Sequence, residues 1–187
     1  MKKYKYIFII LFLLTSKNFG GEIRDRAEAV IKQNFNDSCK INVFKFQVEN
    51  GLRFNAEKHG KQRFFGKFVY YYEIIENDEI AGYAILDNVL GKFKPITFMV
   101  ICDQEKSIKS VEVIKYREQH GGAVAKRSWL DQFKNSDLNS NFELDEDIDG
   151  ISGATISVKS LLKGIKKIMY LVNNLGKDER NLLTSIK

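Results

Sequence analysis

The segment 149–157, Asp-Gly-Ile-Ser-Gly-Ala-Thr-Ile-Ser, holds the residues best suited to chemistry, and it leads directly into a long amphipathic pattern. Two glycines bracket a tight loop, Ser152 is expected to cap the helix, and Thr155 and Ser157 carry hydroxyls in its first turn. The first amide groups of a helix lack partners within it, and its dipole is positive there, so a phosphate would be stabilised at this point. The residues alone leave two interpretations open: a phosphate site, or an ordinary glycine-rich turn with a serine cap.

Asp149 and the run Ser152-Gly153-Ala154-Thr155, followed by Ser157, resemble the flavinylation motif of the FMN-binding domain. That domain occurs in the covalent-flavin subunits of the sodium-pumping NADH:quinone reductase and of related ferredoxin-linked ion pumps, and also as small stand-alone exported proteins. In that family the last threonine of the motif bears FMN through a phosphoester, installed by a dedicated FMN transferase. The resemblance therefore implies FMN bound covalently to Thr155, with the other motif residues around it. Helix geometry agrees with this choice, because positions two apart point about 200° apart: Thr155 is expected at the edge of the flavin cleft, and Ser157 is expected to point more toward solvent.

The resemblance extends over roughly residues 80 to 173 and is stronger to the stand-alone members. The family's central strands are matched by Gly82-Tyr83-Ala84, 88–92 and Pro95-Ile96-Thr97. Its pre-motif strand and glycine turn are matched by 111–113, Tyr116-Arg117-Glu118 and Gly121-Gly122.

Glu118, Gly121 and Gly122 are accordingly assigned to the flavin site by resemblance. His120 in the same turn is expected to be solvated, and Trp129 to belong to the core. Lys92 could meet a phosphate, but it is better explained as an exposed lysine at the end of a strand.

The spacing of apolar residues predicts the helices and strands that must position these residues. Apolar residues at helical spacing predict helices over 22–35 and 158–173, with a shorter one over 128–133. Strands are predicted over 41–48, 69–76, 80–86, 96–103 and 107–117. Gly164 inside the long helix implies close packing of helix on sheet, and 135–150 is expected to be an exposed acidic approach to the motif. Because the strand connections are short, pairing should be antiparallel. The fold class is thus α+β, a single domain with one largely antiparallel twisted sheet and flanking helices.

Residues 1–20 are interpreted as a signal peptide, with lysines followed by an apolar run over 7–14. As a helix this run would cover about 12 Å, far less than the roughly 30 Å of a bilayer core. Cleavage near Gly20 or Gly21 predicts an extracytoplasmic, periplasmic protein, and an uncleaved anchor is the alternative. The leader would contact the membrane only during export or as that anchor. Residues 21–79 form the N-terminal region of the domain, 80–175 the FMN-binding core and 176–187 a polar tail.

The charge, the cysteines and the histidines bear on whether the protein binds nucleic acid, forms a disulfide or holds a metal ion. Four lysines and no acid lie within 1–20, so the net charge of +6 falls to +2 without that segment, which argues against a nucleic-acid partner. Cys39 and Cys102 could pair in an exported protein, although two separate buried thiols are favoured. His59 and His120 are too scattered for a metal site, and no catalytic residue is assigned.

Together these features favour an electron carrier that exchanges electrons with membrane or extracytoplasmic redox proteins. No Gly-x-Gly-x-x-Gly run is present, so direct NAD binding is not expected. Two alternatives stay open. One is a flavin-dependent reductase of a small acceptor, and the other is a binding or adaptor module whose motif is not modified.

Overall fold

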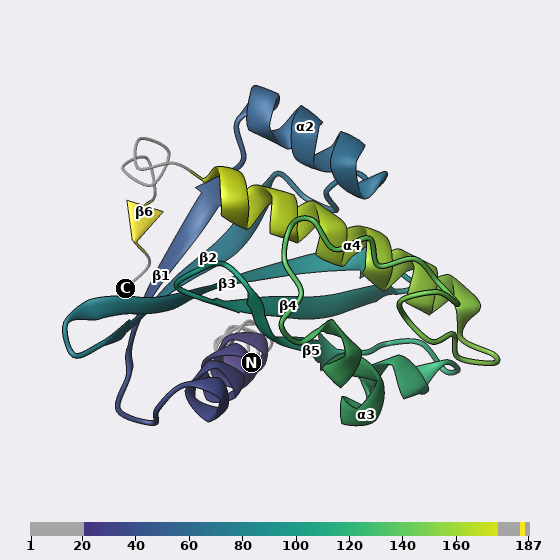
Figure 1. The fold of residues 1–187 in the computed structure, drawn as a ribbon, viewed down its shortest axis with the longest axis horizontal. Helices are drawn as coiled ribbons and strands as arrows, with labels where there is room; N and C mark the ends of the chain where they lie inside the picture. The colour runs from purple at the N-terminus through teal and green to yellow at the C-terminus, as the bar shows by residue number, and fades with distance from the viewer. Residues whose placement is uncertain (1–20, 176–183, 186–187) are drawn as a thin grey trace, which may run out of the picture.

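The computed structural model describes residues 21–175 and 184–185, and it is built around one antiparallel sheet (Figure 1). Its strand order is β5-β4-β3-β2-β1-β6. The strands are β1 (Lys40–Gln47), β2 (Phe68–Glu76), β3 (Glu79–Leu90), β4 (Pro95–Asp103), β5 (Ile108–Lys115) and β6 (Thr184–Ser185). All neighbouring strands pair antiparallel, and helices flank the sheet, so the predicted α+β fold class is confirmed.

Local turn chemistry explains the β2–β3 hairpin. Asn77 and Asp78 both have positive φ, 53° and 63°. A two-residue turn with both residues left-handed matches the right-handed twist of the strands, and Asn and Asp tolerate that region well. The predicted antiparallel pairing is confirmed for β2 with β3 and for β4 with β5, and β3 continues past the predicted end at residue 86 to Leu90.

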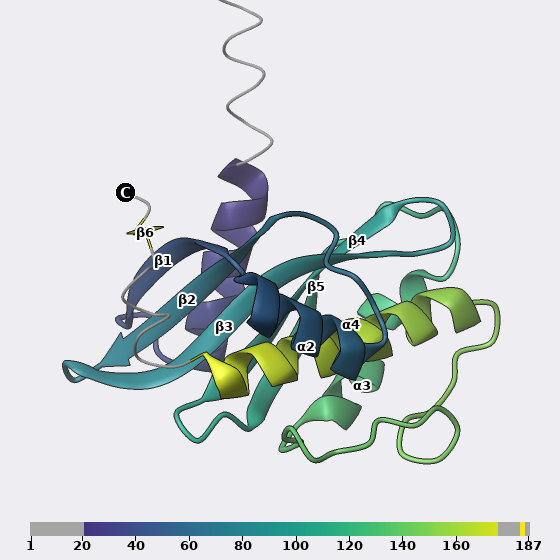
Figure 2. The same cartoon turned by 90° about the horizontal axis from the view of Figure 1, so that it is seen from above.

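Helices cover both faces of the sheet. The described part of the N-terminal helix, 21–34, lies on one face, and α2 (Asn50–Gly60) and α4 (Thr155–Asn174) lie on the other (Figures 1 and 2). A Cβ placed on Gly164 of α4 would lie 2.6 Å from Val89 Cγ1 and 2.9 Å from Phe98 Cζ. The predicted close approach of this helix to the sheet is therefore confirmed, since any side chain at residue 164 would collide with β3 and β4.

A buried ion pair also joins α4 to β3. Lys167 Nζ lies 2.9 Å from Asp87 Oδ2, and the two side chains are 0% and 3% exposed. Lys167 Nζ also donates to the carbonyl of Arg63 at 3.2 Å, in the segment that follows α2. The pair thus connects three elements within the core.

Helix α2 was not predicted, because its sequence carries little amphipathic signal. It begins with Asn50-Gly51, and its buried residues are Ala56 and Gly60. Gly60 lies against α4, where an added Cβ would come within 2.6 Å of the Lys163 carbonyl oxygen. The position of α2 therefore depends on packing against a helix about a hundred residues away. The short helix predicted over 128–133 is confirmed as α3 (Arg127–Leu130) followed by the 3-10 turn η2 (Asp131–Phe133).

Several smaller expectations can also be compared with the structure. Cys39 and Cys102 are separate, buried thiols, as favoured above. The stretch 135–150 is less exposed than predicted, because Phe142 and Ile148 are buried and anchor it to the core. The predicted leader, 1–20, and all of the polar tail except β6 lie outside the described residues. Among the described residues, no helix has the length and apolar character needed to cross a membrane.

Candidate functional site

The motif 149–155 forms the loop that enters α4. Gly153 has a φ of +77°, in the left-handed region that favours glycine, and Ala154 is the N-cap residue. The predicted cap by Ser152 is wrong: Ser152 is exposed, two residues before the N-cap, and no side chain caps this helix. The amide groups of the first turn of α4 therefore lack a side-chain acceptor, which is the arrangement that accommodates an anion.

A hollow of about 700 Å³ lies directly beside this helix start. Three segments line it: the β3–β4 turn, the chain after β5 and the first turn of α4. The lining residues are Lys92, Phe93, Lys94, Glu118, Gln119, His120, Gly153, Ala154, Thr155, Ile156 and Ser157. Its volume is in the range of small-molecule and cofactor sites.

Thr155 and Ser157 both line the hollow, but their surroundings differ. Thr155 is exposed, whereas Ser157 is only 5% exposed and its Oγ lies 3.3 Å from Tyr116 Oη. Positions two apart on a helix point about 200° apart, so one hydroxyl faces outward and the other inward. The prediction that Ser157 points toward solvent is wrong, because the turn after β5 covers it. Thr155 is the hydroxyl that another molecule can reach.

Glu118 holds the β3–β4 turn in place. Its Oε1 accepts hydrogen bonds from the backbone N–H of Phe93 at 2.6 Å and of Lys94 at 3.0 Å. These donors, Lys94 first, hold the pKa of the Glu118 carboxyl below its usual value. A Cβ on Gly91 would lie 2.6 Å from Glu118 Oε1 and 3.1 Å from the Lys94 carbonyl oxygen, so a larger residue here would disturb this contact. Glu118 therefore shapes the wall that carries Lys92 and Phe93.

The glycine turn touches the motif directly. Gly121 has a φ of +79°, and a Cβ there would lie 2.8 Å from Tyr116 Oη and 3.3 Å from Ala154 Cβ. Tyr116 Oη also donates to the carbonyl of His120 at 2.5 Å, which fixes the turn. Gly122, which begins the 3-10 turn η1 (Gly122–Ala125), makes no comparably close approach, and neither glycine lines the hollow. Exposed His120 lies at the rim, as expected.

Trp129 and Gln132 position the start of the motif, a role that the sequence did not indicate. Trp129 Nε1 donates to the carbonyl of Asp149 at 2.8 Å, and the N–H of Asp149 donates to Gln132 Oε1 at 2.8 Å. Trp129 is buried, as predicted, and the Asp149 side chain is exposed. Asp149 is therefore held by its backbone, which leaves its carboxylate free.

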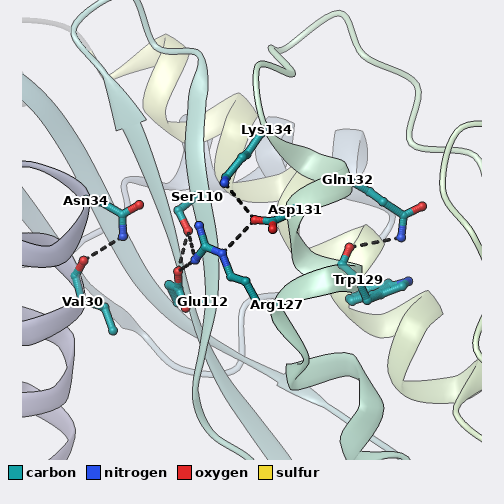
Figure 3. Close-up of polar contacts among 9 residues, drawn as sticks. All are labelled: Val30, Asn34, Ser110, Glu112, Arg127, Trp129, Asp131, Gln132 and Lys134. Atoms are coloured by element: carbon teal, nitrogen blue, oxygen red, sulfur yellow. Dashed lines mark hydrogen bonds and ion pairs between the residues drawn. The ribbon is translucent and has the colours of Figure 1, made fainter.

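Arg127 links the segment that carries Trp129 and Gln132 to the sheet (Figure 3). Its guanidinium donates to Glu112 and, at 3.1 Å, to Ser110 Oγ, both on β5. Its Nε lies 2.8 Å from Asp131 Oδ1, which Lys134 also contacts. A continuous set of contacts thus runs from β5 through α3 and η2 to the motif loop.

These residues fit an FMN phosphate. The uncapped helix start can accept the phosphate, and Lys92 and Lys94 add positive charge at the same hollow. Among the described residues, no group of His, Cys, Asp or Glu side chains is arranged to hold a metal ion.

Comparison with known proteins agrees with this geometry. Residues 91–169 match the family model of the FMN-binding domain. No curated protein is matched. The matched range contains the β3–β4 turn, the chain after β5 and the first turn of α4, which are the three walls of the hollow. Residues 91–169 of this chain are therefore those of an FMN-binding domain, which supports a flavoprotein.

Proposed function

We propose that this protein is an exported electron carrier that holds FMN through a phosphoester to Thr155. The observation that carries the proposal is the position of Thr155: an exposed hydroxyl at the uncapped start of α4, on the wall of a hollow within the FMN-binding domain. Maturation needs an FMN transferase and an activated FMN donor. As Thr155 Oγ bonds to phosphorus, the donor's leaving group departs and the hydroxyl proton is released.

The residues around the hollow would each have a defined role toward the bound group. The first-turn amides of α4 donate to the phosphate, and the Lys92 and Lys94 ammonium groups offset its charge. Glu118 and Tyr116 hold the two turns that face it. The flavin supplies the electron chemistry when bound, while the protein sets its position and electrostatics.

Export explains why a covalent link is useful. Outside the cytoplasm, FMN lost by dissociation is difficult to replace, and a phosphoester prevents that loss while leaving the ring free. The leader predicted over 1–20 motivates the extracytoplasmic location, and the partners would be membrane or extracytoplasmic redox proteins. N-terminal sequencing of the native protein tests the location, and a cytoplasmic chain beginning at Met1 would contradict it.

The attachment site is tested by co-expression with an FMN transferase, followed by intact mass and peptide mapping. Thr155→Val removes the hydroxyl at nearly constant shape from an exposed position, so it should abolish the covalent flavin and preserve the fold. Ser157→Ala is the matched control and should retain the flavin. Asp149→Asn should weaken modification, because it neutralises the exposed carboxylate next to the loop.

Three results would contradict the proposal in different ways. FMN mapped to Ser157, or FMN retained in Thr155→Val, would exclude Thr155 as the acceptor. An unmodified wild-type chain from flavinylating cells would favour a binding or adaptor module. Steady turnover of a small acceptor without partner proteins would favour the reductase alternative.

A further inference from the structure

Large apolar side chains that remain exposed gather at one end of the sheet. This is the end where β2 begins, β3 finishes and the β3–β4 turn lies. The described residues contain seven such side chains: Phe54, Phe65, Phe68, Tyr70, Leu90, Phe93 and Ile156. None lies on the β2–β3 or β4–β5 hairpin turn at the opposite end. We call this region, with the basic residues described next, the aromatic end.

Basic side chains are interspersed with these aromatics. The exposed ones are Lys45, Arg63, Lys67, Lys92 and Lys94. Two nearby acids are engaged within the fold: Glu57 pairs with Arg53 at 3.0 Å, and Glu118 accepts backbone hydrogen bonds. Glu22 pairs with Lys115 at 2.8 Å, while Glu49 next to α2 and Asp145 beside the start of α4 remain as exposed acids.

The opposite end of the sheet has a different character. Its two hairpin turns carry the exposed acids Asp78, Glu79 and Glu105. Asp78 there pairs with Lys40 at 2.8 Å, so the clearest difference between the two ends is that the exposed large aromatic side chains lie only at the first, among the described residues. A mixture of exposed aromatic and basic side chains is suited to binding a surface with an anionic outer layer above an apolar interior.

The chain also enters the fold at the aromatic end. Ile23 and Arg24, near the start of the described N-terminal helix, line a hollow of about 430 Å³ together with Phe65, Phe68 and Tyr70. The first described residues of the chain therefore lie beside the exposed aromatics.

We infer that the aromatic end rests on an anionic phospholipid surface. Phe and Tyr side chains enter the headgroup region, while Lys and Arg contact lipid phosphates and keep their charged tips in the polar layer. The hollow beside Thr155 shares Phe93, Lys92 and Lys94 with this end. Docking on lipid therefore holds that hollow close to the membrane surface. The inference does not depend on whether Thr155 is modified.

A fluorescent probe placed at each end of the full-length chain tests contact with lipid. Gly66→Cys lies among the exposed aromatics, and an added Cβ there meets nothing closer than 3.8 Å. Gln104→Cys, exposed in the β4–β5 turn, is the matched control at the opposite end. The native thiols of Cys39 and Cys102 are buried and should not react with the environment-sensitive NBD label.

The two probes should respond differently to vesicles of phosphatidylcholine and phosphatidylglycerol. Emission at residue 66 should rise severalfold and shift to the blue, and added salt should reverse the change. Emission at residue 104 should stay constant. A leader that anchors the chain brings both probes to the same vesicles, so only direct contact with lipid separates them.

Charge reversal tests the basic residues. Lys67→Glu with Lys92→Glu in the Gly66→Cys chain should remove most of the emission change. Lys32→Glu, an exposed site near the other end of the N-terminal helix, should leave it intact. Equal thermal midpoints establish that the variants are folded.

Several outcomes would overturn the inference. Unchanged emission at residue 66, or an equal change at both positions, would exclude docking by the aromatic end. The same response with phosphatidylcholine alone would exclude an anionic surface. A change without vesicles that grows with protein concentration would assign this end to a second copy of the chain.

Discussion

Substituting Gly121 measures how the glycine turn supports the motif. An alanine there must adopt a φ of +79°, which costs about 1–2 kcal/mol for an L-residue. Its Cβ would also lie 2.8 Å from Tyr116 Oη, and the hydroxyl can move away only by giving up its hydrogen bond to the His120 carbonyl. That loss adds about 1 kcal/mol. Gly121→Ala should therefore destabilise the fold by about 2–3 kcal/mol.

Gly153→Ala provides the matched control. Its φ of +77° is nearly the same, but an added Cβ has no neighbour within 4 Å, so only the cost of about 1–2 kcal/mol for the backbone conformation applies. In a Tyr116→Phe background the obstructing hydroxyl is gone. The free-energy cost of Gly121→Ala should then fall to that of Gly153→Ala. Urea unfolding followed by the fluorescence of Trp129, the single tryptophan, measures all of these free energies. Equal costs for the two glycines, or an undiminished Gly121→Ala cost without the hydroxyl, would refute this reasoning.

Three further substitutions test the supports of the site. Lys167→Met should destabilise the fold by about 3–5 kcal/mol in urea unfolding, because it leaves the buried Asp87 carboxylate unpaired. Gly164→Ala should cost about 1–3 kcal/mol, because its Cβ would overlap side chains of β3 and β4. The pKa of the Glu118 carboxyl is lowered by the hydrogen bonds that it accepts from backbone N–H groups. Its contribution to the stability of the fold is therefore fully present above its ordinary pKa and is lost as the pH falls through the lowered pKa. Glu118→Gln should speed amide hydrogen exchange of the 92–94 turn at neutral pH. It should also reduce the loss of stability that the wild-type protein shows as the pH falls.

Two of these substitutions have a control within the chain. Lys166→Met, which removes a surface pair with Glu143, should cost far less than Lys167→Met. Gly51→Ala in α2 meets nothing within 4 Å, so it should not destabilise. A Lys167 variant as mild as the Lys166 one, or 92–94 exchange that is insensitive to Glu118, would show that the corresponding contact contributes little.

Elements with local determinants could be predicted from the sequence. The β2–β3 hairpin follows from Asn77-Asp78 between two β-rich runs, and α4 follows from its apolar spacing. Helix α2 could not be predicted, because the packing of Gly60 on α4 joins residues far apart in the chain. Its own sequence offers only a weak apolar face.

The candidate site divides in the same way. Its motif and the exposed Thr155 could be anticipated, since a glycine-rich loop before a helix is a local pattern. The burial of Ser157 could not, because it depends on where Tyr116 lies after β5. The hydrogen bonds of Trp129 and Gln132 with the Asp149 backbone likewise depend on tertiary structure, and neither residue type predicts that role.

The sheet order sets a lower limit on the autonomous folding unit. The FMN-binding match begins at residue 91, whereas β4 pairs along its whole length with β3, which ends at Leu90. A fragment cut at residue 91 would open that edge of β4, where Ile96 to Cys102 are all buried in the intact fold. Such an apolar, unpaired edge recruits other chains, so the excised segment should aggregate. A transplantable flavin module from this protein must therefore include the strands upstream of the recognised segment.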